Sequence, residues 1–156
     1  MSEFGSRRSL SQEQPQQSRF LSICRMFSIG SESKLTELKP ALFSGCNSLR
    51  SFVIPNNVEH IGSQTFHHCG KLSTISISKE SKLRDIGEMA FDGCSLLEEV
   101  FVPKFVEVVR SKAFNGCTSL SDLRFDLRSQ SLVIESTAFY ECTSLPEVNF
   151  SSGLHN

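Results

Sequence analysis

The sequence lacks several features that would point to particular functions. Its formal net charge is only −1 over 156 residues, so it has no general attraction for nucleic acid or an anionic membrane. No apolar run approaches the roughly 18 residues of a membrane span, so we expect no membrane-spanning helix in this chain. We find no nucleophile elbow, phosphate-binding loop or HExxH motif. The sequence therefore predicts no enzyme, no catalytic residue, no cofactor and no nucleic-acid partner.

Paired metal ligands are also missing. The chain contains no CxxC or HxxxH spacing, and His67-His68-Cys69 is a single adjacent triplet. Structural zinc sites need four such ligands, usually in two closely spaced pairs. The sequence therefore assigns no metal site.

One sequence motif recurs five times along the chain. A Phe is followed three residues later by Cys, three residues after that by Leu, and then by two apolar residues on alternate positions. The Phe residues are Phe43, Phe66, Phe91, Phe114 and Phe139. Self-similarity with a period of about 20 to 50 residues predicts a solenoid, in which each coil packs on its neighbours.

Five of the six cysteines belong to this repeat, at Cys46, Cys69, Cys94, Cys117 and Cys142. A disulfide framework has irregular spacing, whereas these residues share one repeat position. Their side chains should point the same way, like rungs, each packed as a small apolar group with a weak donor. We expect these thiols to be free and buried.

The steps between these cysteines are 23, 25, 23 and 25 residues, so every second coil is two residues longer. Each coil is predicted to hold a short strand, a turn, a pair of apolar residues and a short helical turn into the Phe. The extra residues fall just after the strand, at Ser78 to Lys82 and Asp126 to Ser131. A solenoid tolerates insertions at such a loop.

The chain divides into a tail and a repeat region. Residues 1–17 are rich in Ser, Gln, Glu and Arg, and we expect them to be disordered; Glu3-Phe4-Gly5-Ser6 resembles an expression scar. Residues 18–156 are predicted to form five to six coils, truncated in the middle of a repeat. No polar capping repeat follows, so we expect end-to-end self-association through the uncapped C-terminal coil.

The pattern LxxIxIPxxVxxIGxxAFxxCxxL, clearest over residues 46–66, resembles the BspA-like class of leucine-rich repeats over roughly residues 18–154. The resemblance implies an α/β fold, a curved right-handed solenoid. Its parallel β-sheet would form the concave face, with short strands and helical turns on the other sides. It also implies a surface protein of the bacterial or protozoan type, for which adhesion to host proteins or cells is the usual proposal. The chain shows no signal sequence or anchor, which leaves a cytoplasmic location as the alternative.

The strand face is the predicted contact surface. Strand alternation turns the neighbours of the inward apolar residues toward solvent. These outward pairs are Ser51/Val53, Thr74/Ser76, Glu99/Phe101, Asp122/Arg124 and Glu147/Asn149. Val53 and Phe101 are apolar side chains on a solvated face, and aromatic residues are enriched at interfaces.

Acidic residues Glu99, Asp122 and Glu147 occupy one position in three successive coils. Like charges on neighbouring strands repel modestly. Three interpretations stay open: a solvated face with Arg124 as counter-ion, a basic protein partner, or a hard cation such as calcium.

The sequence as a whole favours non-catalytic protein recognition at a cell surface, with a protein ligand on the strand face. One alternative is an intracellular scaffold or regulatory module. Another is a purely structural spacer.

Overall fold

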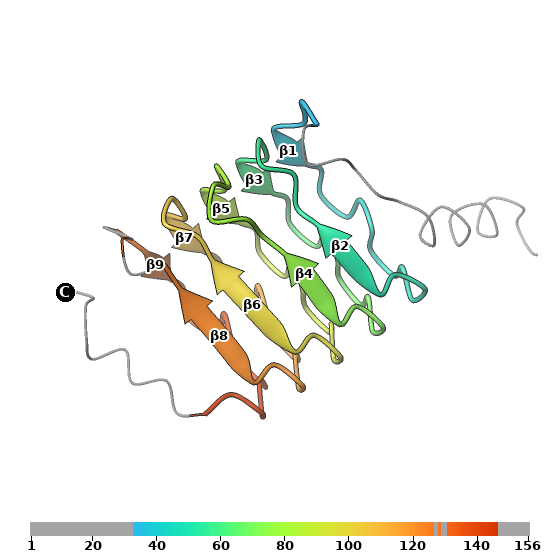
Figure 1. The fold of residues 1–156 in the computed structure, drawn as a ribbon. Coiled ribbons are helices and arrows are strands. Elements are labelled where there is room, and N and C mark those ends of the chain that lie inside the picture. The colour runs from blue at the N-terminus through green and yellow to red at the C-terminus, as the bar shows by residue number, and fades with distance from the viewer. Residues whose placement is uncertain (1–32, 127, 129–130, 147–156) are drawn as a thin grey trace, which may run out of the picture.

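The computed structural model describes residues 33–126, 128 and 131–146, and these run as a stack of coils (Figure 1). Each coil holds a two-residue strand and a row of turns, and in the first four coils a longer strand follows. The short strands form one sheet: β1 (Glu37–Leu38), β3 (His60–Ile61), β5 (Asp85–Ile86), β7 (Val108–Val109) and β9 (Val133–Ile134). The longer strands form a second sheet: β2 (Ser51–Val53), β4 (Thr74–Ser76), β6 (Glu99–Val102) and β8 (Asp122–Phe125).

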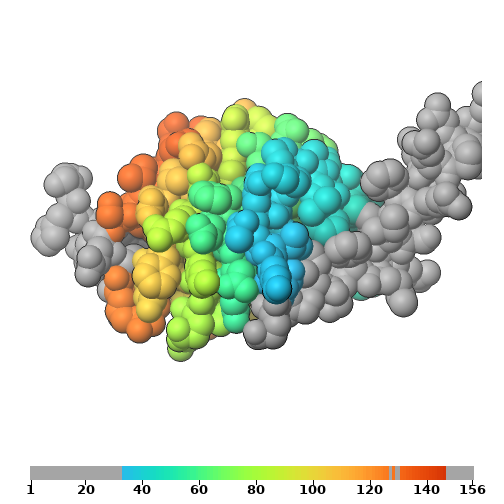
Figure 2. All heavy atoms as spheres, turned by 90° about the horizontal axis from the view of Figure 1, so that it is seen from above, coloured from blue at the N-terminus to red at the C-terminus, as the bar shows by residue number. Residues whose placement is uncertain are grey.

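Every strand pairs in parallel with the strand one coil away. We number the coils from the N-terminus: coil 1 (37–54), coil 2 (60–77), coil 3 (85–102), coil 4 (108–125) and coil 5 (from 133). Seen from above, successive coils lie side by side along the length of the molecule (Figure 2). The expected parallel-sheet solenoid with short strands on a second side is therefore confirmed.

The helical turns and the α/β class are not found, because no helix occurs within residues 33–126 or 131–146. The segment around each Phe is instead a row of tight turns. Two residues before the Phe and two residues after it, the backbone has a positive φ, as at Gln64 (58°) and His68 (56°). A left-handed residue cannot continue a right-handed helix, so the chain bends repeatedly.

These turns bond both along their own chain and to the next coil. The amides of Thr65 and His67 donate to carbonyls three residues back, at 3.3 and 3.1 Å, and the amides that alternate with them donate across coils. The amides of Gln64, Phe66 and His68 donate to the carbonyls of Glu88, Ala90 and Asp92, with N···O distances of 2.9, 2.7 and 2.7 Å. Equivalent bonds join coil 1 to coil 2, coil 3 to coil 4, and coil 4 to coil 5. In every case the amide belongs to the earlier coil and the carbonyl to the later one. The amides that bond between coils in this turn column therefore all point the same way along the stack.

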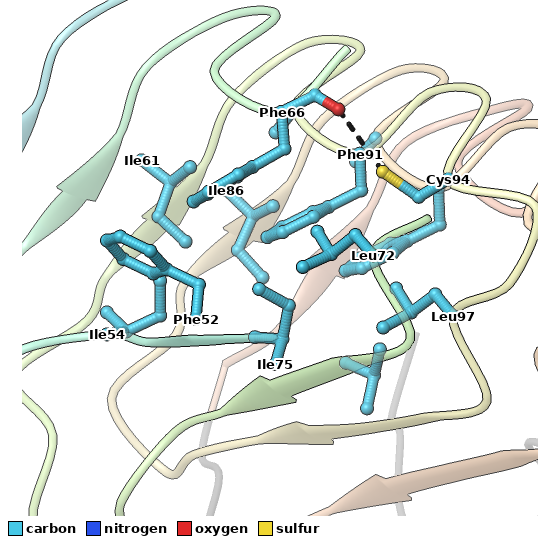
Figure 3. Packing of buried hydrophobic residues seen from close by; sticks show 14 of the residues in the cluster. Phe52, Ile54, Ile61, Phe66, Leu72, Ile75, Ile86, Phe91, Cys94 and Leu97 are labelled. Atoms are coloured by element: carbon cyan, nitrogen blue, oxygen red, sulfur yellow. Dashed lines mark hydrogen bonds between the residues drawn. The ribbon is translucent and has the colours of Figure 1, made fainter. Parts of the chain in front are cut away.

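The core is a set of columns that run through the stack, and the Phe column is its centre (Figure 3). The rings of Phe66 and Phe91 lie 5.0 Å apart and 7° from parallel, and those of Phe91 and Phe114 lie 5.0 Å apart and 5° from parallel. Offset stacking adds to the burial of large apolar surface. Leu72 and Leu97 form the adjoining column and are fully buried.

The cysteine column binds one coil to the next. The thiol of Cys94 donates to the carbonyl of Phe66 in the preceding coil, at 3.2 Å (Figure 3), and Cys69, Cys117 and Cys142 make the same contact in their own coils. These four are free thiols, as expected. Cys46 departs from the expectation, because it is disulfide-bonded.

Corners of two lengths connect the coils. Residues 55–59 and 103–107 form the short corners, and residues 78–84 and 126–132 form the long ones, which follow coils 2 and 4. The last strand-side residue is fully buried before a short corner, at Ile54 (1%) and Val102 (0%). It is only partly buried before a long corner, at Ile77 and Phe125. The strand end before a long corner is therefore less completely covered, although Ile77 and Phe125 still pack against the core.

The Phe column predicts unequal effects of truncation. Phe91 is stacked on both sides, whereas Phe139 is partly buried and stacks on Phe114 at 5.2 Å. We expect Phe91→Ala to lower the free energy of unfolding by about 3–5 kcal/mol, and Phe139→Ala to lower it by less. Urea titrations followed by circular dichroism measure both variants, and equal midpoint shifts would contradict nearest-neighbour packing.

Candidate binding surface

The outward face of the four-stranded sheet holds two rows of side chains. Register pairs Ser51 with Thr74 and Glu99 with Asp122 in the first row, and Val53 with Ser76 and Phe101 with Arg124 in the second. Val53 is 49% exposed and Phe101 is partly exposed. The predicted outward residues Glu147 and Asn149 lie outside the described residues. Whether this face binds a ligand stays a prediction.

Arg124 neutralises much of the predicted acidic column. Its guanidinium lies 2.7 Å from Glu99 Oε2 and 3.2 Å from Asp122 Oδ2. All three side chains are at least half exposed, so each pair contributes at most about 1 kcal/mol to stability. Of the three interpretations of these acids, the structure contains the counter-ion arrangement.

Coils 1 and 2 present a different surface on the same sheet. Their outward strand residues are Ser51, Val53, Thr74 and Ser76, so β2 and β4 carry no charge. The uncharged area extends to Phe101 in coil 3. Apolar and hydroxyl-bearing side chains therefore cover the first half of the face, and mutually paired charges cover the second.

The five-stranded sheet carries its own ion pairs across coils. Arg110 binds Asp85 through two guanidinium nitrogens, with a shortest distance of 2.6 Å, and lies 3.8 Å from Glu135. The Asp85 carboxylate raises the pKa of Arg110. Arg84 pairs with Glu107 at 2.5 Å. The charges on this face are already engaged with one another.

The ladder of the four-stranded sheet is interrupted between β4 and β6. β2 and β4 pair at three positions and β6 and β8 at four, but β4 and β6 pair only at Thr74 and Glu99. In coil 1 the amide of Ile54 donates to Ser76 at 3.0 Å, whereas the equivalent amide of Ile77 has no acceptor among the described residues. Pro103 has no N–H to donate back to coil 2. This break was not predicted, although the long corner after Ile77 and the proline at 103 are its sequence signals.

The region described by the structure offers little else for chemistry. The imidazole of His67 lies 3.2 Å from Asp92, and Asn115 donates to the same carboxylate at 2.7 Å. Within residues 33–126 and 131–146, no group of three or more His, Cys, Asp and Glu side chains could hold a metal ion. In those same residues, no helix has the length and apolar character to cross a bilayer.

Comparison with protein families matches the BspA type leucine rich repeat region in six copies, over residues 16–132 and 124–156. These matches span most of the sequence. The chain belongs to this family. Its family membership agrees with the resemblance predicted from the repeat phrase.

Solved structures of bacterial leucine-rich repeat proteins resemble the chain closely. A leucine rich cell surface protein from Faecalibacterium prausnitzii is 27% identical, with a TM-score of 0.68 over 77% of this chain and 30% of its own. The leucine-rich repeat protein of T. pallidum is 30% identical, with a TM-score of 0.68 over 76% of this chain and 55% of its own. This BspA-type chain therefore spans about half or less of the length of these two proteins. A search of curated proteins finds no match.

The buried thiols of this BspA-type solenoid are poor nucleophiles. Burial raises the pKa of Cys69 and Cys142 to about 11 and raises that of Cys94 and Cys117 further. Since the thiolate is the reactive form, the column is inert at neutral pH. The leucine-rich repeat family is typically non-catalytic, and this column fits a structural role.

The raised thiol pKa values predict alkaline destabilisation. Above the ordinary cysteine pKa of about 8.5, the unfolded chain loses protons that the folded coil keeps, so stability present at lower pH is lost as pH rises. Each such thiol steepens the decline by about 1.4 kcal/mol per pH unit. Urea titrations between pH 8 and pH 10.5 should give Cys94→Ala a shallower slope than the parent chain. Identical slopes would contradict the assignment.

Proposed function

We propose that the chain is a non-catalytic protein-recognition module and that its contact surface is the outward face of the four-stranded sheet. The observation that carries this proposal is the exposure of Val53 and Phe101 on that face. The five-stranded sheet, by contrast, has its central charges paired across coils. Aromatic and apolar anchors at the centre of a face dominate binding energy in most protein interfaces.

We propose a cell-surface location for this recognition. Support comes from the F. prausnitzii relative, which is described as a leucine rich cell surface protein. Adhesion or binding to a host protein is the corresponding role. A solenoid suits it, because stacked coils build an extended surface from repeated short strands.

We also propose end-to-end self-association through the C-terminal coil. Phe139, Cys142 and Leu145 are only partly buried there, although the equivalent residues of coil 4 are at most 1% exposed. Covering this apolar end would remove it from water. Sedimentation velocity should then show a larger species whose share grows with protein concentration. One monomeric species at all concentrations would contradict this proposal.

Three alanine substitutions test the contact surface: Phe101→Ala and Val53→Ala on the four-stranded sheet, and Val133→Ala on the five-stranded sheet. Proteins captured by the immobilised chain are identified by mass spectrometry, and their affinity is then measured with purified components. We expect Phe101→Ala to weaken binding by about 2 kcal/mol or more, and Val53→Ala to weaken it less. Val133→Ala is the control, because Val133 is 55% exposed on the five-stranded sheet.

All three substitutions lie at exposed or partly exposed positions, so we expect stability changes within about 0.5 kcal/mol for the two valines. Circular dichroism melts check that each variant is folded. Loss of binding in Val133→Ala, with none in Phe101→Ala or Val53→Ala, would assign the contact surface to the five-stranded sheet instead.

A further inference from the structure

We propose a second contact surface on the corners of coils 2 and 3, made of Lys82, Lys104 and Phe105 and called here the corner surface. Its partner is a protein segment in which an acidic residue lies beside an apolar or aromatic one. The corners join the four-stranded sheet to the five-stranded sheet, so this surface shares no residue with the outward face described above. The inference therefore goes beyond the proposed function and can be tested separately from it.

The register of the five-stranded sheet places Lys82 beside Phe105. The paired residues that begin its strands in coils 2, 3 and 4 are His60, Asp85 and Val108. Counting back three residues from each gives Asn57, Lys82 and Phe105. Counting back two residues gives a fully buried column, Val58, Leu83 and Val106. Lys82 Nζ also donates to Asn57 Oδ1 at 2.9 Å. Both observations agree with this register, so Lys82 and Phe105 lie on adjacent corners, about 4.8 Å apart at the backbone.

Phe105 is the aromatic anchor of the corner surface. It is 46% exposed, whereas every other phenylalanine among the described residues is buried or partly buried. The equivalent position holds a polar residue on the two preceding corners, Asn57 and Lys82, so the repeat itself does not need an aromatic ring there. Phe105 also lies outside the core cluster. Since exposed aromatic residues are enriched at interfaces, its ring is a contact group for a partner.

Two lysines give this aromatic site a positive charge. Lys104 Nζ lies 4.6 Å from the centroid of the Phe105 ring, within the range of a cation–π contact. Lys82 is exposed on the adjacent corner. In the part of the chain that the structure describes, neither lysine forms an ion pair with a carboxylate. Both ammonium groups can therefore receive an acidic group from outside.

The acidic residues of the neighbouring corners interact mainly with arginines. Glu107 pairs with Arg84 at 2.5 Å, and Asp126 pairs with Arg128 at 2.8 Å. Hydrogen bonds from Arg128 are the main reason that the pKa of Asp126 is lowered, and the charge of Lys104 is the smallest contribution. Lys104 is therefore not required to neutralise that carboxylate.

This combination of groups selects a partner with one acidic group beside one apolar group. The acidic group would pair with Lys82 or Lys104, and the apolar group would pack on the Phe105 ring. A polyanion fits less well, because Glu80 and Glu107 on the same corners would repel its further charges. A protein segment with both kinds of side chain is therefore favoured over a uniformly anionic chain.

The probe is a library of random linear peptides displayed on phage. It is first depleted on a triple variant, Lys82→Gln, Lys104→Gln and Phe105→Ala, and then selected on the full parent chain, so that the peptides retained require the corner surface. We expect them to combine Asp or Glu with an apolar or aromatic residue. Their affinity should fall roughly tenfold in Phe105→Ala. It should also fall as ionic strength rises from about 0.01 M to 0.15 M, over which the screening length falls from about 30 Å to about 8 Å.

Two matched variants serve as controls. Lys71→Gln removes the same charge from an exposed lysine that lies in the turns before β4. Phe101→Ala removes the partly exposed aromatic ring of the four-stranded sheet. Both should leave the affinity within about twofold, because they lie away from the corner surface. Circular dichroism melts of every variant, the triple variant included, exclude misfolding as the cause of lost binding.

Several results would overturn the inference. If no peptide survives the depletion, the corner surface does not bind peptides. Survivors without acidic residues, or acidic survivors without an apolar residue, would contradict the chemistry of the partner. An equal loss of affinity in Lys71→Gln would show that binding follows net charge alone. A loss in Phe101→Ala with none in Phe105→Ala would assign the peptides to the outward face of the four-stranded sheet, which would leave the proposed function intact.

Discussion

The rest of the molecule depends on the aligned hydrogen bonds of the turn column. Each interface between the first four coils has three of these bonds, and the interface between coils 4 and 5 has two. They satisfy the amides of turns that form no helix, and they fix the coil spacing at which Phe rings stack near 5 Å. Since every inter-coil bond of the column points the same way, the dipoles of those peptides add, as in an α-helix. The two ends of the stack are therefore not equivalent.

The sequence was informative about what points inward and much less about the backbone that holds it there. Phe91, Cys94 and Leu97 recur with a spacing that predicted a column of buried residues, and all three are fully buried. The turns were mistaken for helical turns, because a short segment with an apolar residue every three or four positions fits both. Non-glycine residues such as Gln64 and Met89 adopt a positive φ, and nothing in their identity signals it. Bonds to the next coil from the amides of Gln64 and Met89 stabilise that conformation, together with turn bonds to their carbonyls within the same coil.

The candidate surface was predictable in part for the same reason. Period-two alternation predicts Val53, Phe101 and Arg124 on the outward face, and the strands carry them there. Alternation does not determine which neighbouring residue a long side chain contacts. The ion pairs of Arg124 with Glu99 and Asp122 could therefore not be predicted from the sequence. Two local sequence features accompany the break between β4 and β6: the long corner after Ile77 and Pro103. The long corner and Pro103 each affect the backbone of one coil. They interrupt the ladder together because the fold places them on neighbouring coils.

The alternation of short and long corners also gives any longer array of this repeat a structural period of two coils. If every long coil that precedes a short one shortens the ladder, equivalent interruptions recur every second coil, about 10 Å apart along the stack at the usual strand spacing. A flexible partner with several contact groups could then reach equivalent positions on several coils at once. Each contact would be weak, but linking them raises the effective concentration of the next one. Length of the array, rather than the strength of one site, would then set how tightly such a protein holds its ligand.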